Sequence, residues 1–220
     1  MRIAILQANL NNFDNSMSPV EQDTVHEVHF HRFTDGNFPP ITGLTPRMQY
    51  RIPKTHAWQM LPDCGKYDVI IWLDGSITFK RSDCVAYYLS QLADNDMAFW
   101  KHPVRRNIKQ EVEHIEKHLR LGKPYITNRY KNGLHRECLD EIQKDETYKD
   151  RTLYASTSFI YRNTLKVQKA LKDWWYWQSR FYSCDQIPLP YVLWLNDIKV
   201  GVMNEPLFKS GYISLVSKHK

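Results

Sequence analysis

Apolar and polar positions follow two periods along the 220-residue chain, and the two periods alternate. Short apolar or alternating runs predict strands at residues 1–10, 25–33, 67–74, 97–100, 153–161, 198–200 and 212–216. Apolar positions three and four apart predict helices at 46–61 with a break near Pro53, 85–92, 108–121, 123–132, 165–179 and at the start of 185–195. Gly133 is expected to end the fourth of these helices. Strands that alternate with helices place the chain in the α/β class.

The segment from Tyr67 to Phe79 is the most informative part of this pattern. Its apolar run is typical of a strand buried on both faces, and Asp74, Gly75 and Ser76 follow at its carboxyl end. Open α/β sheets bind ligands at that edge, and a carboxylate there suits a divalent cation held against a diphosphate. The alternative is a turn or capping aspartate, because Asp-Gly is a common turn pair.

Arg47, Arg51 and Lys54 stand four and three positions apart, so one helical face can present all three. Arginine can bind phosphate oxygens in pairs, and lysine adds a point charge. This face is therefore a candidate for neutralising a diphosphate. A solvated basic face is the alternative interpretation.

Two groups of histidines lie near the middle of the chain. His102 and Arg105 follow the strand at 97–100, so they are expected at the same sheet edge as Asp74. They could bind a phosphate or a sugar hydroxyl there, or they could belong to an ordinary structural loop. His114 and His118 share a helical face, but the metalloprotease pattern His-Glu-x-x-His is absent because Ile115 follows His114. We therefore expect a charged surface face there.

Asp185 and Gln186 follow a helix rich in aromatic residues, which is itself expected to be core. An aspartate before an apolar helical run is often only a cap. A carboxylate embedded among Trp175, Trp177 and their neighbours would instead have a pKa tuned by apolar surroundings. Both interpretations stay open from the local sequence.

Composition limits the class of protein more than its function. Hydrophobic residues make up 42% and charged residues 25%, as in soluble globular proteins. No stretch reaches the roughly 20 apolar residues of a membrane span, and the first apolar run is too short for a signal peptide. The four widely spaced cysteines are expected to be free thiols. The net charge of +6 suits anionic partners without choosing among them.

Several motifs occur together in a recognisable order. They are Tyr-Asp-x-x-x-Trp-Leu-Asp-Gly-Ser-Ile at 67–77, Phe-x-x-His-Pro-x-Arg at 99–105, Tyr-x-x-Gly-Leu at 130–134, Phe-Ile-Tyr-Arg-Asn at 159–163, Trp-Trp at 174–175 and Asp-Gln-x-x-x-x-Tyr-Val at 185–192. This order, over roughly residues 47–195, resembles a small glycosyltransferase-like family long catalogued as a domain of unknown function. Its members occur in bacteria, plant cell-wall proteins and some large DNA viruses. It also resembles, more loosely, the GT-A class of nucleotide-sugar glycosyltransferases.

The resemblance implies a single GT-A-like, Rossmann-like α/β domain over residues 1–220, with a mixed, mostly parallel sheet flanked by helices. The chain would be this domain alone or one domain of a longer polypeptide. The implied activity is metal-dependent hexosyl or deoxyhexosyl transfer from a nucleotide sugar, with a UDP-sugar favoured, to a glycan or glycoprotein acceptor. The expected location is the cytoplasm, or the host cytoplasm for a viral member.

Residue by residue, the resemblance makes Asp74 the ligand of Mn²⁺ or Mg²⁺. Ser76 stands where many GT-A enzymes have a second aspartate, so water or the donor diphosphate would complete the shell around the cation. Asp185 is the candidate catalytic carboxylate, near the donor sugar or the acceptor hydroxyl, and Cys184 replaces an arginine of the family's pattern. The candidate nucleotide-sugar-binding residues are Gln7, Asn9, Arg47, Arg51, Lys54, Asp74, Ser76, His102, Arg105 and Gln186.

Two other functions are compatible with the sequence. A catalytically inactive sugar-nucleotide-binding or assembly protein would explain the serine at position 76. A nucleic-acid-binding module would use the positive charge and the aromatic residues, but the 24 acidic residues offset much of the 30 basic ones. No common nucleic-acid-binding motif is present, so nucleic acid is not an expected partner.

Overall fold

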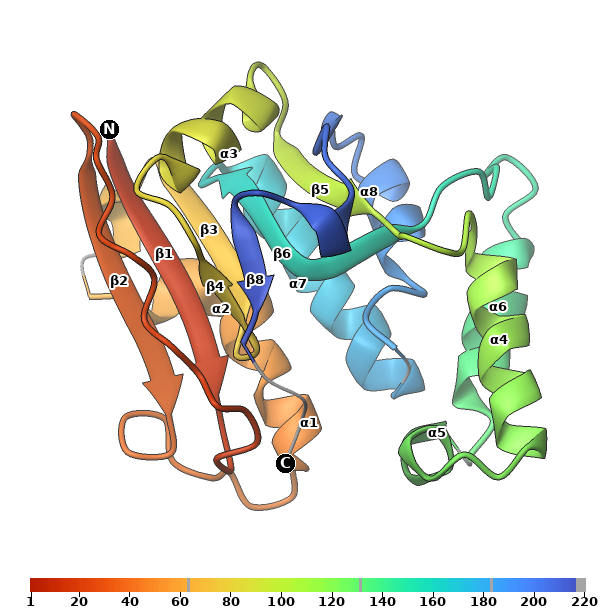
Figure 1. Cartoon of the computed structure of the whole chain (residues 1–220). Helices are drawn as coiled ribbons and strands as arrows, with labels where there is room; N and C mark the ends of the chain where they lie inside the picture. The colour runs from red at the N-terminus through yellow and green to blue at the C-terminus, as the bar shows by residue number, and fades with distance from the viewer. Residues whose placement is uncertain (63, 131, 183, 217–220) are drawn as a thin grey trace.

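A computed structural model of the chain describes all residues except 63, 131, 183 and 217–220 (Figure 1). Within the described residues, the central sheet has six strands in the order β2-β1-β3-β6-β5-β7. These are β1 (Arg2–Asn9), β2 (Glu27–Thr34), β3 (Val69–Asp74), β5 (Met97–Lys101), β6 (Tyr154–Arg162) and β7 (Val200–Val202). A second, two-stranded sheet pairs β4 (Ile77–Phe79) with β8 (Ile213–Leu215).

Strand direction determines which residues meet at the sheet edge. Strands β1, β2 and β3 are parallel, and so are β5 and β7, whereas β6 is antiparallel to both of its neighbours. The carboxyl ends of β1, β3 and β5 therefore lie at the same edge as the amino end of β6. The predicted α/β class and the mixed, mostly parallel sheet are confirmed.

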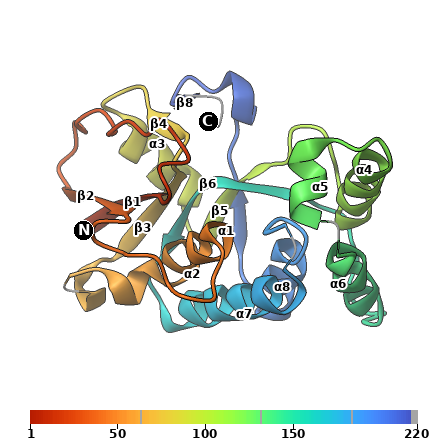
Figure 2. The same cartoon turned by 90° about the horizontal axis from the view of Figure 1, so that it is seen from below.

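Helices cover both faces of the sheet (Figure 2). They are α1 (Pro46–Gln49), α2 (Arg51–Met60), α3 (Cys84–Leu92), α4 (Ile108–Arg120), α5 (Pro124–Tyr130), α6 (Leu134–Gln143), α7 (Leu165–Phe181) and α8 (Leu189–Leu195). Helices α2, α7 and α8 pack on one face, while α3 and the β4–β8 pair pack on the other. Helices α4, α5 and α6 form an arm to one side of the sheet, joined to it through the ends of β5 and β6 (Figures 1 and 2).

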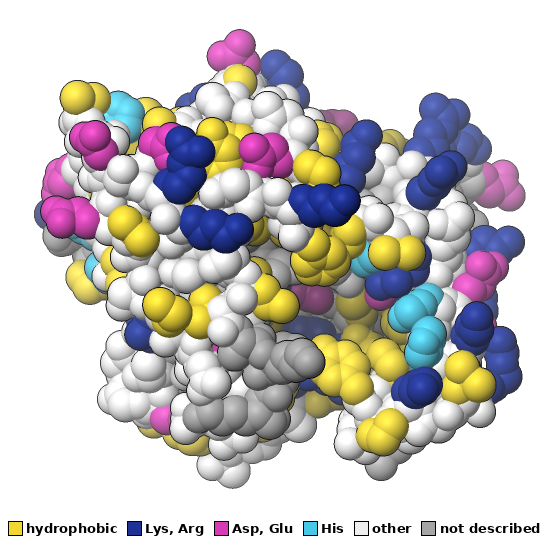
Figure 3. All heavy atoms as spheres, viewed as in Figure 1, with side chains coloured by type: hydrophobic (Ala, Val, Ile, Leu, Met, Phe, Trp, Pro, Cys, Tyr) yellow, Lys and Arg dark blue, Asp and Glu magenta, His cyan; other side chains and the backbone are white. Residues whose placement is uncertain are grey.

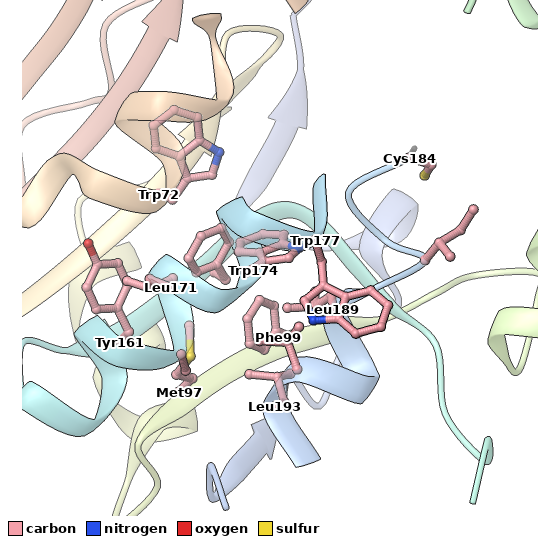
Figure 4. Packing of buried hydrophobic residues seen from close by; sticks show 14 of the residues in the cluster. Trp72, Met97, Phe99, Tyr161, Leu171, Trp174, Trp177, Cys184, Leu189 and Leu193 are labelled. Carbon is pink, nitrogen blue, oxygen red and sulfur yellow. The ribbon is translucent and has the colours of Figure 1, made fainter. Parts of the chain in front are cut away.

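The alternation of strand side chains places one apolar cluster on each face of the sheet. Trp72, Phe99 and Tyr161 point from β3, β5 and β6 toward α7, where Trp174 and Leu171 complete the larger cluster (Figure 4). Trp174 is 1% and Trp177 is 9% exposed, so the prediction that the aromatic helix is core is confirmed for the face that carries these two, whereas Tyr176 is 54% exposed. Helix α7 thereby fixes the segment that follows it, which carries Asp185.

Three local predictions were wrong, each for an identifiable reason. The first basic helix breaks at Tyr50, not near Pro53. Pro53 lies in the first turn of α2, where backbone N–H groups make no hydrogen bond within the helix, so a proline is tolerated there. Gly133, with φ +76°, is the N-cap of α6, a helix that the spacing of apolar residues did not predict, and α5 already ends at Tyr130. The segment 185–195 is helical only from Leu189 onward, and residues 185–188 form a turn.

No described helix is both long enough and apolar enough to cross a bilayer.

Candidate active site

A cavity of about 910 Å³ opens at the edge of the sheet where β1 and β3 end and β6 begins. One wall comes from the sheet and from α1 and α2, and the other from α4 and α5. Figure 3 shows the hollow between these two parts of the molecule, with hydrophobic and histidine side chains along it. Of the candidate site residues, it is lined by Asn9, Arg47, Arg51, Asp74, Ser76, Arg105, Asp185 and Gln186. The cavity therefore gathers most of the residues that the sequence singled out.

Asp74 ends β3 and lies in the cavity wall, with its side chain 24% exposed. Its Oδ1 accepts hydrogen bonds from the Tyr50 hydroxyl, from the indole of Trp72 at 2.7 Å and from the ammonium of Lys54 at 3.1 Å. Among the described residues, Oδ2 has no hydrogen-bond partner. One carboxylate oxygen is thus fixed by the protein, and the other is available to a ligand.

Lys54 lies beneath the cavity instead of lining it, and is 1% exposed. Its Nζ lies 2.7 Å from Oδ2 of Asp185 and 3.1 Å from Oδ1 of Asp74, and it also contacts the Ser156 hydroxyl at 3.4 Å. Burial by itself would lower the pKa of Lys54, but Asp185 and then Asp74 raise it above its usual value. Lys54 is therefore a permanent cation that ties the two carboxylates together.

Asp185 follows α7 in the chain and is fixed at both its backbone and its side chain. Its carbonyl accepts a hydrogen bond from the Trp174 indole at 2.8 Å, and its Oδ2 accepts one from Ser156 at 2.8 Å as well as from Lys54. Burial alone would raise the pKa of Asp185, but Lys54, then Arg51 and the hydrogen bonds hold it well below the usual range. Asp185 is ionised at any ordinary pH.

Asp74 differs from Asp185 in its electrostatics. Burial raises the pKa of Asp74, Lys54 acts against this rise, and the neighbouring Asp185 adds to it. Two carboxylates that share one ammonium leave net negative charge at this point of the cavity. A cationic group, or a cation bound with an anionic ligand, would balance that charge.

Two arginines supply positive charge beside this pair. Arg47 donates to the carbonyl of Arg129 at 3.2 Å and to the Tyr130 hydroxyl at 2.7 Å. Both acceptors are neutral, and within the described chain Arg47 has no carboxylate partner at ion-pair distance. Arg51 is 2% exposed, and burial followed by the charge of Arg47 lowers its pKa. Two adjacent guanidinium groups in one cavity are a suitable site for an anion with several oxygens.

The predicted pair after β5 is only partly in the cavity. Arg105 lines it and forms an ion pair with Glu111 of α4. His102 does not line it, because its Nε2 lies 2.9 Å from Nη2 of Arg105 and its Nδ1 accepts the backbone N–H of Arg105 at 2.9 Å. Burial, with a smaller effect of Arg105, lowers the pKa of His102 to about 4. His102 therefore holds the backbone of the loop that carries Arg105 instead of facing a ligand.

Gln7 also lies away from the cavity. It is fully buried in β1, donates to the carbonyl of Ile77 at 2.8 Å and accepts from Nε of Arg32 at 2.7 Å. Asn9, at the end of β1, lines the cavity and holds the loop that carries Asp14 through two hydrogen bonds with its backbone. The binding roles predicted for Gln7, Lys54 and His102 remain predictions, and their positions favour indirect action.

The donor set for a divalent cation is small. Among the residues that the structure describes, no group of three His, Cys, Asp or Glu side chains converges on one point. Ser76 is buried and its hydroxyl is a neutral ligand, so Asp74 Oδ2 is the strongest oxygen ligand of the 74–76 segment, and the Asp14 carboxylate lies beside Gly75 on the same wall. Hard cations take about six oxygens. The residues therefore fit Mn²⁺ or Mg²⁺ only if a ligand such as a diphosphate supplies most of the remaining oxygens.

Several residues that shape the site were not among the candidates predicted from the sequence. Tyr50 was overlooked, although it stands three positions after Arg47 and four before Lys54, on the same helical face. Ser156 was also missed, and its polar side chain in an otherwise apolar strand was the available signal. His114, which was assigned to the surface, lines the cavity.

The chain resembles several solved structures at low sequence identity. No curated protein sequence matches the chain significantly. Among solved structures, mouse xyloside xylosyltransferase 1 in its apo form is 10% identical, with a TM-score of 0.44, over 92% of this chain and 85% of that one. The galactosyltransferase LgtC with donor and acceptor sugar analogs is 9% identical, with a TM-score of 0.40, over 90% and 72% of the two chains. A197 from STIV is 8% identical, with a TM-score of 0.35, over 92% and 81%.

The match to a family model is more decisive than these distant likenesses. It covers residues 42–216, which include the basic helices, Asp74, the α4–α5 wall of the cavity and Asp185, but not the end of β1 and the loop after it that line the other wall. The chain belongs to the TOD1/MUCI70 glycosyltransferase-like family.

Proposed function

We propose that this protein transfers a sugar from a nucleotide sugar, a UDP-sugar in the first instance, to a glycan acceptor. The observation that carries the proposal is the meeting of Asp74 and Asp185 with Arg47 and Arg51 in one cavity. The arginines suit a diphosphate, and the carboxylates suit a cation and an electron-poor sugar ring.

In this proposal the donor diphosphate lies between the arginines and Asp74. A divalent cation on Asp74 Oδ2 would neutralise charge on the leaving diphosphate. Asp74 supplies too few oxygens alone, so the cation and the nucleotide are expected to bind together. Arg47 and Arg51 would bind the remaining phosphate oxygens.

Asp185 would face the donor sugar. Glycosyl transfer develops positive charge on the sugar ring, and a carboxylate that is always ionised stabilises that charge. The low pKa of Asp185 and the fixed position of its Oδ2 suit this electrostatic role. Lys54 and Ser156 would act as positioning residues.

Hydrolysis of the donor tests the proposal. Transferases without an acceptor commonly transfer sugar slowly to water. The protein should therefore release UDP and free sugar from UDP-glucose, UDP-galactose or UDP-N-acetylglucosamine in the presence of Mn²⁺, and Asp185→Asn should lose this activity. UDP binding without hydrolysis of any donor would instead favour an inactive sugar-nucleotide-binding protein.

A further inference from the structure

If the proposed transfer inverts the configuration of the sugar, a protein group on the acceptor side is needed to remove the proton from the acceptor hydroxyl. The carboxylates of the cavity are poorly suited to this task. Asp74 and Asp185 are bound by Lys54, and Glu111 by Arg105. Asp14 lies beside Gly75 on the sheet wall, where the donor is expected. A base on the opposite wall would be better placed for an acceptor.

His114 occupies such a position. It follows Glu111 by three residues in α4, so the two side chains share one helical face, and both line the cavity. Glu111 in turn lies close to the residue before Asp185, since its Oε1 is 3.9 Å from Sγ of Cys184. His114 is therefore about one helical turn along the wall from that region.

The imidazole of His114 has no competing partner in the described part of the chain. Neither ring nitrogen makes a hydrogen bond there. The ring of its neighbour His118 is tilted by 40° against it, with ring centroids 4.1 Å apart, and the Nδ1 of His118 contacts the backbone carbonyl of His114 at 2.9 Å instead of the ring. A partly exposed imidazole without a partner, in a cavity wall, can accept a proton from a ligand.

The surrounding charges keep this imidazole neutral. Burial, then Arg105, His118 and Lys117 lower the pKa of His114 below its usual value. The charged and titratable groups nearby also include His102 of the β5–α4 loop, whose own pKa His114 helps to lower, and the cavity carries Arg129 of α5, Glu111 of α4 and Asp185. At neutral pH, His114 is therefore in the form that a general base requires.

We propose, resting on the proposed function, that His114 is the general base for an inverting transfer. A ring nitrogen takes the proton of the acceptor hydroxyl while the acceptor oxygen bonds to the anomeric carbon. The bond from that carbon to the phosphate oxygen breaks, and its electron pair leaves with the nucleoside diphosphate. The imidazolium then returns its proton to solvent.

Donor hydrolysis allows a direct test, because water replaces the acceptor. The full chain, His114→Gln and His118→Gln are compared with Mn²⁺ and the three UDP-sugars named above. His118 is the matched control, because it stands on the same helix but does not line the cavity. The measurements are kcat against pH, UDP affinity by calorimetry, and the anomer released, by proton NMR at early times.

We expect His114→Gln to lower kcat by about 100-fold or more with little change in UDP affinity. His118→Gln should stay within a few-fold of the unaltered protein. In the unaltered protein, kcat should rise with pH through a pKa below 6.5, and the sugar released first should have the inverted configuration.

Retention of configuration, or a His114→Gln variant that keeps its kcat, would overturn the assignment while leaving the transferase proposal standing. UDP binding without any hydrolysis would overturn the assignment and leave only nucleotide binding. Failure to bind UDP at all would overturn the proposed function itself, so the two failures are distinguishable.

Discussion

The ammonium of Lys54 lies 2.7 Å from Oδ2 of Asp185, and this contact joins residues 131 positions apart in the chain. The same nitrogen lies 3.1 Å from Asp74, so one buried cation fixes both carboxylates of the candidate site. The helical spacing predicted that Lys54 shares a phosphate-binding face with Arg47 and Arg51. The structure separates the three, with the arginines in the cavity wall and the lysine beneath it.

We expect Lys54→Met to destabilise the protein strongly. The methionine retains much of the apolar stem but leaves two partly buried carboxylates without their shared counter-charge, which costs about 3–5 kcal/mol of unfolding free energy. Urea denaturation measures this cost. Lys144→Ala, which removes an exposed lysine paired with Glu141, should leave the unfolding free energy nearly unchanged, because solvent screens that ion pair. Equal effects of the two substitutions would contradict the role assigned to Lys54.

The pKa of Asp185 predicts a pH dependence of stability. A carboxyl group whose pKa is lowered by folding stabilises the protein above its unfolded pKa of about 3.9, and this contribution is lost as the pH falls through the folded value. Folding raises the pKa of Asp74, so its contribution to the pH dependence of stability has the opposite sign. The contribution of Asp185 must therefore be measured separately.

The isolating comparison is between the unaltered protein and Asp185→Asn. Their difference in unfolding free energy, measured in urea, should be largest above about pH 5 and shrink as the pH falls below about 4. A difference that stays constant over this range would show that the carboxylate of Asp185 is not stabilised by folding.

Arg47 is expected to contribute to nucleotide affinity more than to folding. Its guanidinium has only neutral acceptors among the described residues, so its charge is available to a diphosphate. Losing charge-assisted hydrogen bonds to phosphate should weaken UDP binding by about 10- to 100-fold in Arg47→Ala. Arg81→Ala, on an exposed arginine outside the cavity, serves as the control in the same calorimetric titration. Unchanged affinity in Arg47→Ala would place the phosphates elsewhere.

Gly75 leaves no room for a side chain beside Asp74. A Cβ there would lie 2.7 Å from the carbonyl oxygen of Ala8 and from Oδ2 of Asp14. Gly75→Ala should therefore cost about 1–3 kcal/mol of unfolding free energy and weaken UDP binding by displacing Asp74. Gly65→Ala, where a Cβ meets nothing within 4 Å, should change neither quantity appreciably. An unchanged unfolding free energy of Gly75→Ala would mean that the end of β1, which carries Ala8, can move away from Gly75.

The sequence was most informative where local pattern and tertiary position agree. The apolar run of β3 predicted a central buried strand, and the structure places Asp74 at its end in the cavity wall. Helix α6 was missed because its start depends on Gly133 in a left-handed conformation, which local pattern assigns equally well to a helix end.

Other properties of the site depend on contacts between distant segments. The hydrogen bonds of Ser156 with Asp185 and of Tyr50 with Asp74 exist only once β6, α2 and the turn before α8 have packed together. The position of His114 likewise depends on where the arm of α4, α5 and α6 lies relative to the sheet. No periodicity in the sequence carries that information.

The central claim is that Asp74 holds a cation and a diphosphate together, and calorimetric titration of UDP tests it most directly. We expect the unaltered protein to bind UDP in Mn²⁺ and to bind it at least about tenfold more weakly in EDTA or as Asp74→Asn, with little Mn²⁺ bound in the absence of UDP. UDP affinity that is unchanged by both EDTA and Asp74→Asn would contradict the account.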